Sequence, residues 1–300
     1  MAKRKKGEMI DQQMLILIIL VFVVGIAVGF FFGKRAVTIS EQKQTAPELP
    51  KRERPVRIQP LETKKGLAPL PIPLLPTFAQ KLHPKIAIVI DDVGYDDHLK
   101  DVLWSFPHPV TLAIIPELPY SEFFSKEGKN HGFEIILHQP MEPLRDLKEN
   151  DPTMIKVGMS EKDILKILDK NLKSVKSAVG INNHMGSRAT QDKLVMHVVL
   201  TELKKRGMFF MDSLTTPHSI CREEASAIGE RYLARDVFLD NELESDYIHG
   251  QIEQLIQVAR KTGVAIGIGH YKYNTLSVLK DELSRLKDQG FEIVALRDLL

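Results

Sequence analysis

Residues Lys85 to Tyr95 read KIAIVIDDVGY, and this stretch joins an apolar run directly to two adjacent carboxylates. The five apolar residues from Ile86 to Ile90 predict a strand that is buried in the interior of the fold. Asp91 and Asp92 follow at once, and two carboxylates this close repel each other more strongly when burial removes water. The pair is therefore expected either in a solvated turn or beside a cation.

Short apolar runs recur throughout the chain after Lys85. Eight of them predict strands: Ile86–Ile90, Val110–Ile115, Phe133–Leu137, Val179–Ile181, Met208–Met211, Tyr232–Leu239, Val264–Ile268 and Phe291–Ala295. Amphipathic segments between the strands predict helices, one capped by Ser160, one from Asp192 to Gly207, and two over Ile248–Ala259 and Thr275–Leu286. The inner face of the second helix is expected to carry Leu194, Val195, Val198, Val199 and Leu203. Strands that alternate with helices indicate a parallel sheet, open or closed, and about 215 residues suit a small barrel of the (β/α) type.

The charge and the cysteine content exclude several classes of protein. The 41 basic residues are nearly balanced by 39 acidic ones, and a formal net charge of +2 argues against a nucleic-acid-binding surface. Cys221 is the single cysteine of the sequence, so the chain forms no intramolecular disulfide and no cysteine-based zinc site. We interpret Cys221 as a thiol without a catalytic role.

The N-terminal segment is expected to lie outside the globular body. Residues Met14–Phe32 contain no charged side chain, and these 19 residues are long enough to cross a bilayer of roughly 30 Å as a helix. Basic residues are more numerous before this segment than after it, which predicts a cytoplasmic tail over residues 1–13. A cleaved signal peptide is the alternative, although no clear cleavage site follows the apolar run.

Residues 33–84 are expected to form a linker. Nine of the 17 prolines lie between residues 36 and 84, mixed with charged and polar side chains. The segment Leu67–Pro76 predicts an extended, polyproline-like chain, because proline fixes φ and lacks an N–H donor. The sequence thus predicts a semi-rigid tether that holds a domain over residues 85–300 on the outer face of the cytoplasmic membrane.

Polar residues follow five of the predicted strands. They are Asp91 and Asp92 after the first strand, His138 after the third, Asn182, Asn183 and His184 after the fourth, Asp212 after the fifth, and His270 after the seventh. The C-terminal ends of parallel strands meet at one face, and this face carries the active site in barrels and open α/β sheets. The shared placement of these residues therefore indicates a functional site.

A divalent cation would explain the pair of aspartates. Carboxylate oxygens and neutral imidazole nitrogens are ligands of Zn²⁺, and a catalytic zinc site takes three protein ligands and keeps one open position. We predict Asp92 and His138 as the first two ligands. The third is either Glu142, four residues after His138, or His184 from the next strand end.

The remaining polar residues are expected to act around this ion. Asp91 would take a proton from water as a general base, and His270 would give one to the leaving group. Asn182, Asn183 and Asp212 are predicted to bind the substrate. Plainer interpretations compete with each role, because aspartates cap turns and hold loops, asparagines form turns, and histidines are also found as core or surface residues.

Five motifs carry a resemblance to a known family. IAIVIDDVGY, EIILHQPMEP, GINNHMGSRAT, FFMDSLTT and GIGHY, in this order, resemble the divergent polysaccharide deacetylases, which are related to the NodB-like carbohydrate esterases. The resemblance covers Lys85 to Leu300. It implies a distorted (β/α)7-type barrel and a metal-dependent hydrolase that removes acetyl groups from N-acetylated sugars. It also implies that Asp91 and Asp92 supply the base and a ligand, and that His270 is the acid.

One position departs from the pattern of the broader family. That family carries an H-x-x-x-H motif with two imidazole ligands, whereas this sequence has His138 followed by Glu142. Either Glu142 binds the metal, or His184 restores a second imidazole.

Two functions of different classes are compatible with the sequence. The first is the metal-dependent removal of acetyl groups from a cell-envelope glycan. The alternative is a catalytically weak or inactive domain that binds such a glycan in the same groove, and the missing second histidine favours this alternative. A third possibility keeps the metal and hydrolyses another amide or an ester. Nucleic acid is not expected as a partner.

Overall fold

The structure of the protein is a computed structural model that describes residues 83–146 and 151–300. The predicted N-terminal tail, the predicted membrane anchor over residues 14–32 and residues 33–82 of the predicted linker lie outside the described residues. Within the described part of the chain, no helix combines the length and the apolar character that crossing a membrane requires.

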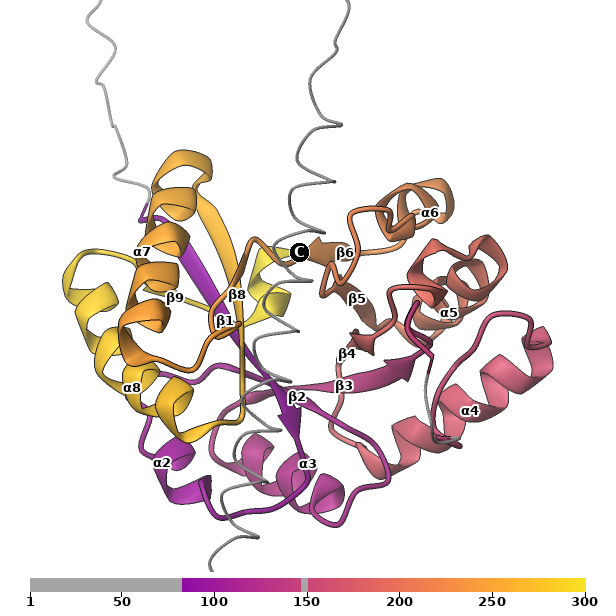
Figure 1. Ribbon diagram of the computed structural model, residues 1–300, viewed down its shortest axis with the longest axis horizontal. Coiled ribbons are helices and arrows are strands. Elements are labelled where there is room, and N and C mark those ends of the chain that lie inside the picture. Colours follow the sequence, from indigo (N-terminus) through magenta and orange to yellow (C-terminus); the bar gives the residue numbers. More distant parts are fainter. Residues whose placement is uncertain (1–82, 147–150) are drawn as a thin grey trace, which may run out of the picture. The chain divides into compact units, whose positions relative to one another are not determined.

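The described residues form one curved sheet of nine strands with helices around its outer side (Figure 1). The strands are β1 (Lys85–Val93), β2 (Thr111–Ile114), β3 (Glu134–Met141), β4 (Gly180–Met185), β5 (Phe209–Asp212), β6 (Tyr232–Ala234), β7 (Val237–Phe238), β8 (Val264–His270) and β9 (Glu292–Ile293). The strand order is β6–β5–β4–β3–β2–β1–β8–β7, and β9 pairs with the start of β1. Every one of these pairs is parallel, as the alternation of strands and helices predicts.

The sixth predicted strand, over residues 232–239, is wrong as a single element. Its first part, β6, pairs with β5, and its last part, β7, pairs with β8 at the other end of the strand order. Only residues 235–236 separate the two short strands, so this segment passes from one edge of the sheet to the other. The arrangement is a partial barrel, which is consistent with the predicted barrel architecture.

Strand β1 lies in the middle of the sheet. It pairs with β8 from Lys85 to Asp91 and with β2 from Val89 onward, and helices cover its outer face. A strand that is buried on both faces needs apolar side chains at successive positions, which explains the uninterrupted apolar run. The strand continues through Asp91 and Asp92 to Val93, so both aspartates belong to the strand rather than to a turn after it.

Seven α-helices accompany the strands in the described residues. They are α2 (Lys100–Trp104), α3 (Ser121–Asn130), α4 (Glu161–Ser174), α5 (Lys193–Arg206), α6 (Cys221–Ile228), α7 (Ser245–Thr262) and α8 (Tyr273–Asp288). Ser160 caps α4 and Asp192 caps α5, each by accepting a hydrogen bond from a backbone N–H of the first turn, as predicted. Gly207 ends α5 in the left-handed conformation, also as predicted. Leu194 is the exception on the inner face of α5, because its side chain is 52% exposed.

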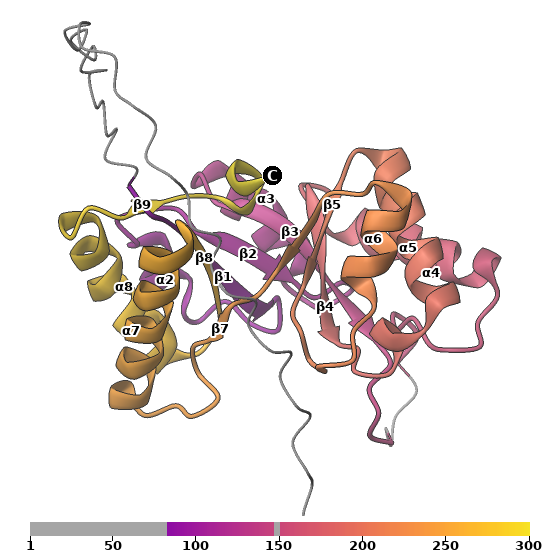
Figure 2. The ribbon, with the colours of Figure 1, turned by 90° about the horizontal axis from the view of Figure 1, so that it is seen from above.

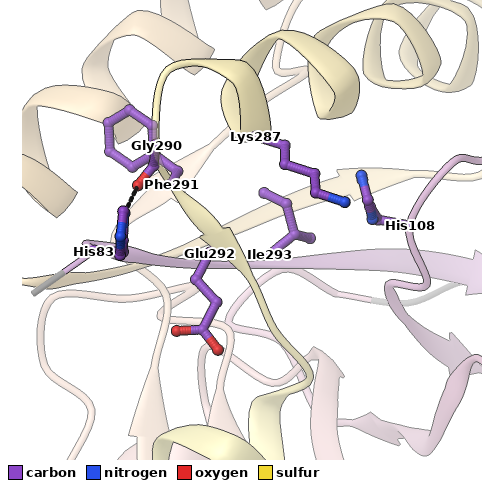
Figure 3. A pocket seen from close by; sticks show the side chains of 7 residues that line it. All are labelled: His83, His108, Lys287, Gly290, Phe291, Glu292 and Ile293. Carbon is purple, nitrogen blue, oxygen red and sulfur yellow. Dashed lines mark hydrogen bonds between the residues drawn. The ribbon is translucent and has the colours of Figure 1, made fainter.

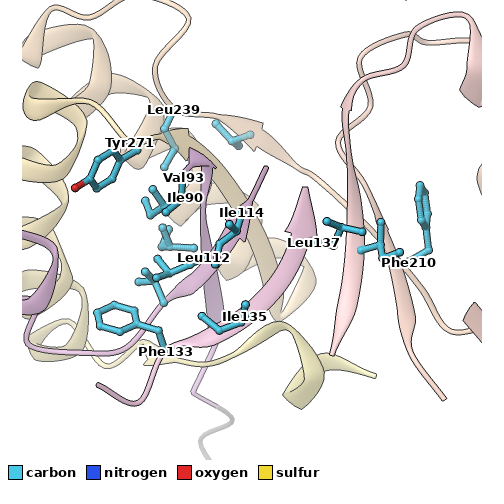
Figure 4. Close-up of a cluster of buried hydrophobic side chains, with 14 of the residues drawn as sticks. Ile90, Val93, Leu112, Ile114, Phe133, Ile135, Leu137, Phe210, Leu239 and Tyr271 are labelled. Carbon is cyan, nitrogen blue, oxygen red and sulfur yellow. The ribbon is translucent and has the colours of Figure 1, made fainter. Parts of the chain in front are cut away.

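The core divides between the two faces of the sheet. Alternate residues of β1 belong to different clusters: Ile86, Ile88 and Ile90 pack toward the helices, while Ala87 and Val89 point to the concave side. Figure 4 shows part of the first cluster, in which side chains of neighbouring strands meet those of the surrounding segments. The helices that supply the first cluster lie on the outer side of the sheet (Figure 2).

A buried carboxylate holds the last segment of the chain against the amino-terminal end of the strands. Glu134, at the start of β3, accepts hydrogen bonds from the backbone N–H of Leu296 at 2.9 Å and from Thr111 Oγ1 at 3.1 Å. It also accepts one from Nε of Arg297 at 2.7 Å. Leu296 begins the 3₁₀ helix η2 (Leu296–Leu299) and packs into the concave core cluster. The last segment of the chain thus packs against this end of the sheet, and the polar residues predicted at the strand ends lie at the opposite end.

Candidate metal centre and active site

Three side chains from three strands converge at the carboxyl-terminal end of the sheet. They are Asp92 on β1, His138 on β3 and His184 on β4. Asp92 Oδ1 lies 3.3 Å from His138 Nε2 and 3.0 Å from His184 Nδ1, and the two nitrogens are 3.2 Å apart. The three atoms thus form a nearly regular triangle of potential ligand atoms, the ligand triangle.

The size of the ligand triangle fits one face of a tetrahedral zinc site. A metal–ligand distance of about 2.0–2.1 Å gives tetrahedral ligand–ligand distances of about 3.3–3.4 Å. Asp92 Oδ1 is buried and lacks a hydrogen-bond partner in the described structure, although a buried carboxylate oxygen normally has one. Two imidazole nitrogens and one carboxylate oxygen are also the donor set that Zn²⁺ takes. The residues therefore fit a divalent cation, with one coordination position left for water or substrate.

The backbone of Asp92 is unusual for a residue in a strand. Its φ is +60°, in the left-handed region that residues with a side chain seldom adopt. The pairing of β1 with β2 is irregular between Ile90 and Val93, so the chain departs from the regular pleat here. Burial opposes the charge of Asp92, but His138 and His184 outweigh it and hold the pKa of this carboxyl well below its usual range.

Asn182 fixes the orientation of His138. Its Nδ2 donates to Asp91 Oδ1 at 2.8 Å and to Ser213 Oγ at 3.2 Å, so its Oδ1 accepts the proton of His138 Nδ1, at 2.8 Å. The other ring nitrogen, Nε2, is then the atom that His138 contributes to the ligand triangle. Burial lowers the pKa of His138, but Asp91 and Asp92 overcome this effect and raise it to about 9. A bound cation would take the place of that proton.

Asp91 lies beside the ligand triangle without belonging to it. Its side chain is almost fully buried, and Oδ2 is 3.6 Å from His138 Nε2. Burial raises the pKa of this carboxyl, and the charges of His138 and His270 together with the hydrogen bond from Asn182 only partly offset the rise. A carboxylate with a raised pKa is a better acceptor of a proton from water than an exposed one.

His270, at the end of β8, also lies near Asp92 and is held by Asp240. His270 Nδ1 donates to Asp240 Oδ1 at 3.0 Å, and Nε2 is 3.9 Å from Asp92 Oδ2. Asp240 also accepts from the backbone N–H of His270 at 2.7 Å and from Thr275 Oγ1 at 2.6 Å. Burial lowers the pKa of His270, but Asp240 outweighs it and the net pKa is raised. With Nδ1 held by Asp240, Nε2 is the ring nitrogen that lies toward Asp92.

Glu142 does not join the ligand triangle. Its side chain accepts hydrogen bonds from the backbone N–H of Val157 at 2.8 Å and from Arg188 Nη1 at 3.2 Å. These contacts tie together the segments after β3 and β4. Of the two candidates for the third ligand, the structure brings His184 to Asp92 and His138 and leaves Glu142 outside.

The three residues that we predict to bind substrate are all buried. Asn182, Asn183 and Asp212 are each at most 1% exposed. Asn183 accepts from the N–H of Ser213 and donates to the carbonyl of Met185, so it connects the end of β4 with the segment after β5. The carboxylate of Asp212 accepts from three groups of its surroundings, Leu214 N, Ser219 Oγ and Tyr232 Oη. Each of the three side chains is thus buried and hydrogen-bonded to protein groups, and their binding of substrate stays a prediction.

Two further side chains at this face, Asp240 and Arg235, are not among the predicted site residues. Asp240 comes directly after the sixth predicted strand, and the rule that selects the other polar residues at strand ends would have found it. Arg235 lies between β6 and β7, where no signal marks it because the two strands look like one. Its guanidinium donates to the carbonyls of Ser213 and Leu214 and lies over the ring of Phe238. It therefore fixes the segment after β5 beside His270, whose ring contacts Phe238.

A separate hollow of about 400 Å³ lies at the amino-terminal end of β1, next to β9 (Figure 3). His83 and His108 line it together with Lys287, and His83 Nδ1 lies 2.8 Å from the carbonyl oxygen of Gly290. These histidines are at the opposite end of the sheet from the ligand triangle.

Comparison with known proteins identifies relatives of the described domain. The sequence profile of the family described as "Divergent polysaccharide deacetylase" matches residues 88–300. An uncharacterised protein of Haemophilus influenzae is 39% identical over 214 residues, which are 71% of this chain and 74% of that protein. The uncharacterised protein YibQ of Escherichia coli is 33% identical over 215 residues, which are 71% of this chain and 66% of that protein.

The fold has also been observed in a crystal structure. An uncharacterised protein of Agrobacterium tumefaciens superimposes with a TM-score of 0.70 at 23% identity, over 73% of this chain and 89% of that chain. At this level of identity the likeness concerns the fold alone.

Proposed function

Because the chain belongs to the divergent polysaccharide deacetylase family, we propose that it is a metal-dependent hydrolase that removes acetyl groups from an N-acetylated glycan of the cell envelope. The observation that carries this proposal is the ligand triangle, in which Asp92, His138 and His184 fit one face of a zinc site. A base candidate, Asp91, and an acid candidate, His270, lie next to it. We propose His184, rather than Glu142, as the third ligand.

The proposed reaction divides the proton transfers between two residues. A bound divalent cation would supply a Lewis acid that polarises the amide carbonyl and lowers the pKa of water. Asp91 accepts the proton of the attacking water at Oδ2, because Oδ1 is already bonded to Asn182. His270 donates the proton of Nε2 to the departing amine nitrogen.

Two buried groups keep these residues in position for the reaction. Asp240 holds His270 by its Nδ1 and stabilises the protonated imidazole, and Asn182 orients both Asp91 and His138. Neither group needs to touch the substrate. They act by fixing which nitrogen or oxygen faces the site.

The cell-envelope location is a proposal from the sequence. An uncharged run over residues 14–32 and a proline-rich linker would hold the domain on the outer face of the cytoplasmic membrane, where acetylated glycans are within reach. This placement suits a hydrolase and a glycan-binding domain equally well.

Release of acetate tests the proposal directly. The full chain, loaded with Zn²⁺, is incubated with an acetylated chitooligosaccharide or a peptidoglycan fragment, and free acetate is measured. We expect release that a chelator abolishes and that added Zn²⁺ restores. Binding of the glycan without any release of acetate would refute the hydrolase and support the alternative, an inactive glycan-binding domain.

A further inference from the structure

A second feature of the carboxyl-terminal face is a hollow of about 360 Å³ that begins at His184. Its other walls come from the segments after β1 and β2 and from residues 151–153, which precede α4. The residues that line it include Tyr95, Pro116, Glu117, Pro140, Asp151 and Lys170. Since His184 belongs both to this hollow and to the ligand triangle, the hollow continues directly from the candidate metal centre.

The aromatic ring of Tyr95 stands at the hollow on a fixed backbone. Its side chain is 54% exposed, although it is one of the larger apolar groups of the chain. The preceding residue, Gly94, has a φ of +127°, and a Cβ there would lie 3.3 Å from Ser121 Oγ. The Gly94 carbonyl accepts from the N–H of Tyr120 at 3.0 Å. A glycine is thus needed at this turn, and the turn holds Tyr95 against the segment after β2.

The wall formed by residues 151–153 is fixed by buried amides. The carbonyl of Thr153 accepts from Gln139 Nε2 at 2.9 Å and from Asn171 Nδ2 at 2.8 Å. Both amide side chains are fully buried, and Asn171 also donates to Gln139 Oε1. Asp151 accepts from the N–H and the hydroxyl of Thr153. The hollow therefore has a pre-formed wall, as ligand-binding sites usually do.

The chemistry of the lining combines apolar surfaces with carboxylates. The prolines at positions 116 and 140 and the ring of Tyr95 supply apolar surface, and the carboxylates of Glu117 and Asp151 supply acceptors. Lys170 balances only one of the two negative charges, by an ion pair with Glu117 at 2.8 Å. A pyranose ring has the complementary chemistry, because its C–H face is apolar while its rim carries hydroxyl or amine donors.

We propose that this hollow is a subsite for one pyranose ring of a glycan, next along the chain from the ring whose acetyl amide lies at the metal. This inference rests on the proposed function, because the subsite is located relative to the ring whose acetyl amide lies at the metal. Tyr95 packs against the C–H face of the sugar, and Asp151 and Glu117 accept from its hydroxyl or ammonium groups. The substrate is then an oligomer or polymer of hexosamine units, rather than a monosaccharide.

Binding of a glucosamine tetramer to the zinc-loaded full chain, in detergent micelles, tests the subsite. This probe has no acetyl group, so the protein cannot turn it over, and its affinity is measured by calorimetry. We expect Tyr95→Ala to weaken binding about tenfold, and Tyr95→Phe to stay within about twofold because the ring is kept. Asp151→Asn is expected to weaken it by about threefold or more, because a charged acceptor is replaced by a neutral amide.

Tyr273 provides a matched control. It is a tyrosine with 62% of its side chain exposed, at the start of α8 and outside the hollow, so Tyr273→Ala is expected to leave the affinity unchanged. Three results would each overturn the subsite. Tyr95→Ala could bind the tetramer with wild-type affinity, Tyr273→Ala could lose as much affinity as Tyr95→Ala, or the wild-type chain could fail to bind the tetramer.

The assay for acetate separates this inference from the proposed function. If the wild-type chain binds the tetramer through Tyr95 but releases no acetate from an acetylated oligomer, the hydrolase is refuted and the subsite stands. If the chain releases acetate while Tyr95→Ala binds the tetramer as the wild type does, the subsite is refuted and the hydrolase stands.

Discussion

At the scale of single residues, buried amide and carboxylate side chains determine how the chemical groups of the site can act. Asn182 donates to Asp91 and accepts from His138, so one amide sets the direction of both the base candidate and a ligand. Asp240 does the same for His270. Because these supports are hydrogen-bonded away from water, removing one leaves its partner without orientation and leaves a buried group unsatisfied.

The two aspartates of β1 are expected to differ in their effect on metal content. Asp92→Asn removes a charged ligand of the ligand triangle and should reduce bound zinc severely. Asp91→Asn leaves all three ligand atoms in place, so it should retain most of the metal while acetate release falls by about 10²-fold or more. Elemental analysis of the two purified variants measures the difference. An equal loss of zinc in both would contradict this division of roles.

Asp240→Asn is expected to shift the pH dependence of acetate release. Asp240 raises the pKa of His270, and an acid with a raised pKa keeps its proton to higher pH. Loss of the negative charge lowers this pKa, so the alkaline limb of the rate profile should move to lower pH and kcat at neutral pH should fall. The measurement is kcat against pH for the wild type and the variant.

Thr275→Ser is the control for this pH shift. It retains a hydroxyl that can donate to Asp240, so its alkaline limb should stay in place. If the alkaline limb of kcat against pH stays in place in Asp240→Asn, His270 is not the group whose deprotonation limits the rate.

The residues of the site illustrate what the sequence can and cannot predict. Position at a strand end predicts that Asp91, Asp92, His138, His184 and His270 come together, and the structure does bring them together. Whether a polar side chain of the site is buried depends on contacts between segments that are far apart in the chain. The sequence does not show these contacts. For that reason the sequence does not show that Asn183 and Asp212 are buried and hydrogen-bonded to neighbouring strands and loops.

At the scale of elements, the two ends of the parallel sheet differ in the side chains that they carry. The carboxyl-terminal ends carry the polar site, and the amino-terminal end of β3 carries Glu134, which holds the start of η2. The carboxylate accepts from backbone and side-chain donors of a segment 162 residues further along the chain. Apolar periodicity predicts strand β3. It contains no information about the contact of Glu134 with Leu296 and Arg297, because this contact depends on one buried carboxylate at the start of the strand.

Glu134→Ala should destabilise the protein without changing the site. It removes the acceptor of Leu296 N and Thr111 Oγ1, and unsatisfied buried donors cost about 1–3 kcal/mol in the free energy of unfolding. Urea denaturation of the full chain measures the change. Glu292→Ala, on the exposed side of β9, is the control and should change the free energy of unfolding by less than about 0.5 kcal/mol. If the two substitutions change the free energy of unfolding by similar amounts, Glu134 does not stabilise the last segment of the chain as proposed.

At the scale of the whole molecule, the partial barrel joins residues that are far apart in the sequence. Asp92, His138 and His184 come from β1, β3 and β4, and the pairing of β3 with β4 places His184 beside Pro140. The spacing of Glu142 suggests a ligand four residues after His138, yet β3 is extended through Met141, so that spacing does not return to the same point as it would in a helix. The sequence could not decide between the two candidates because that choice depends on strand pairing.

Zinc is expected to raise the midpoint of thermal unfolding, because an ion held by three strands binds the folded chain and not the unfolded one. Free zinc at about 100 times its dissociation constant contributes about 2.7 kcal/mol, which for a domain of this size is a shift of about 5–10 °C. Asp92→Asn should abolish the shift. Glu142→Gln should keep it, since Glu142 binds Val157 and Arg188 instead of the ion. Differential scanning calorimetry with and without a chelator measures these shifts, and loss of the shift in Glu142→Gln would show that the glutamate is a ligand after all.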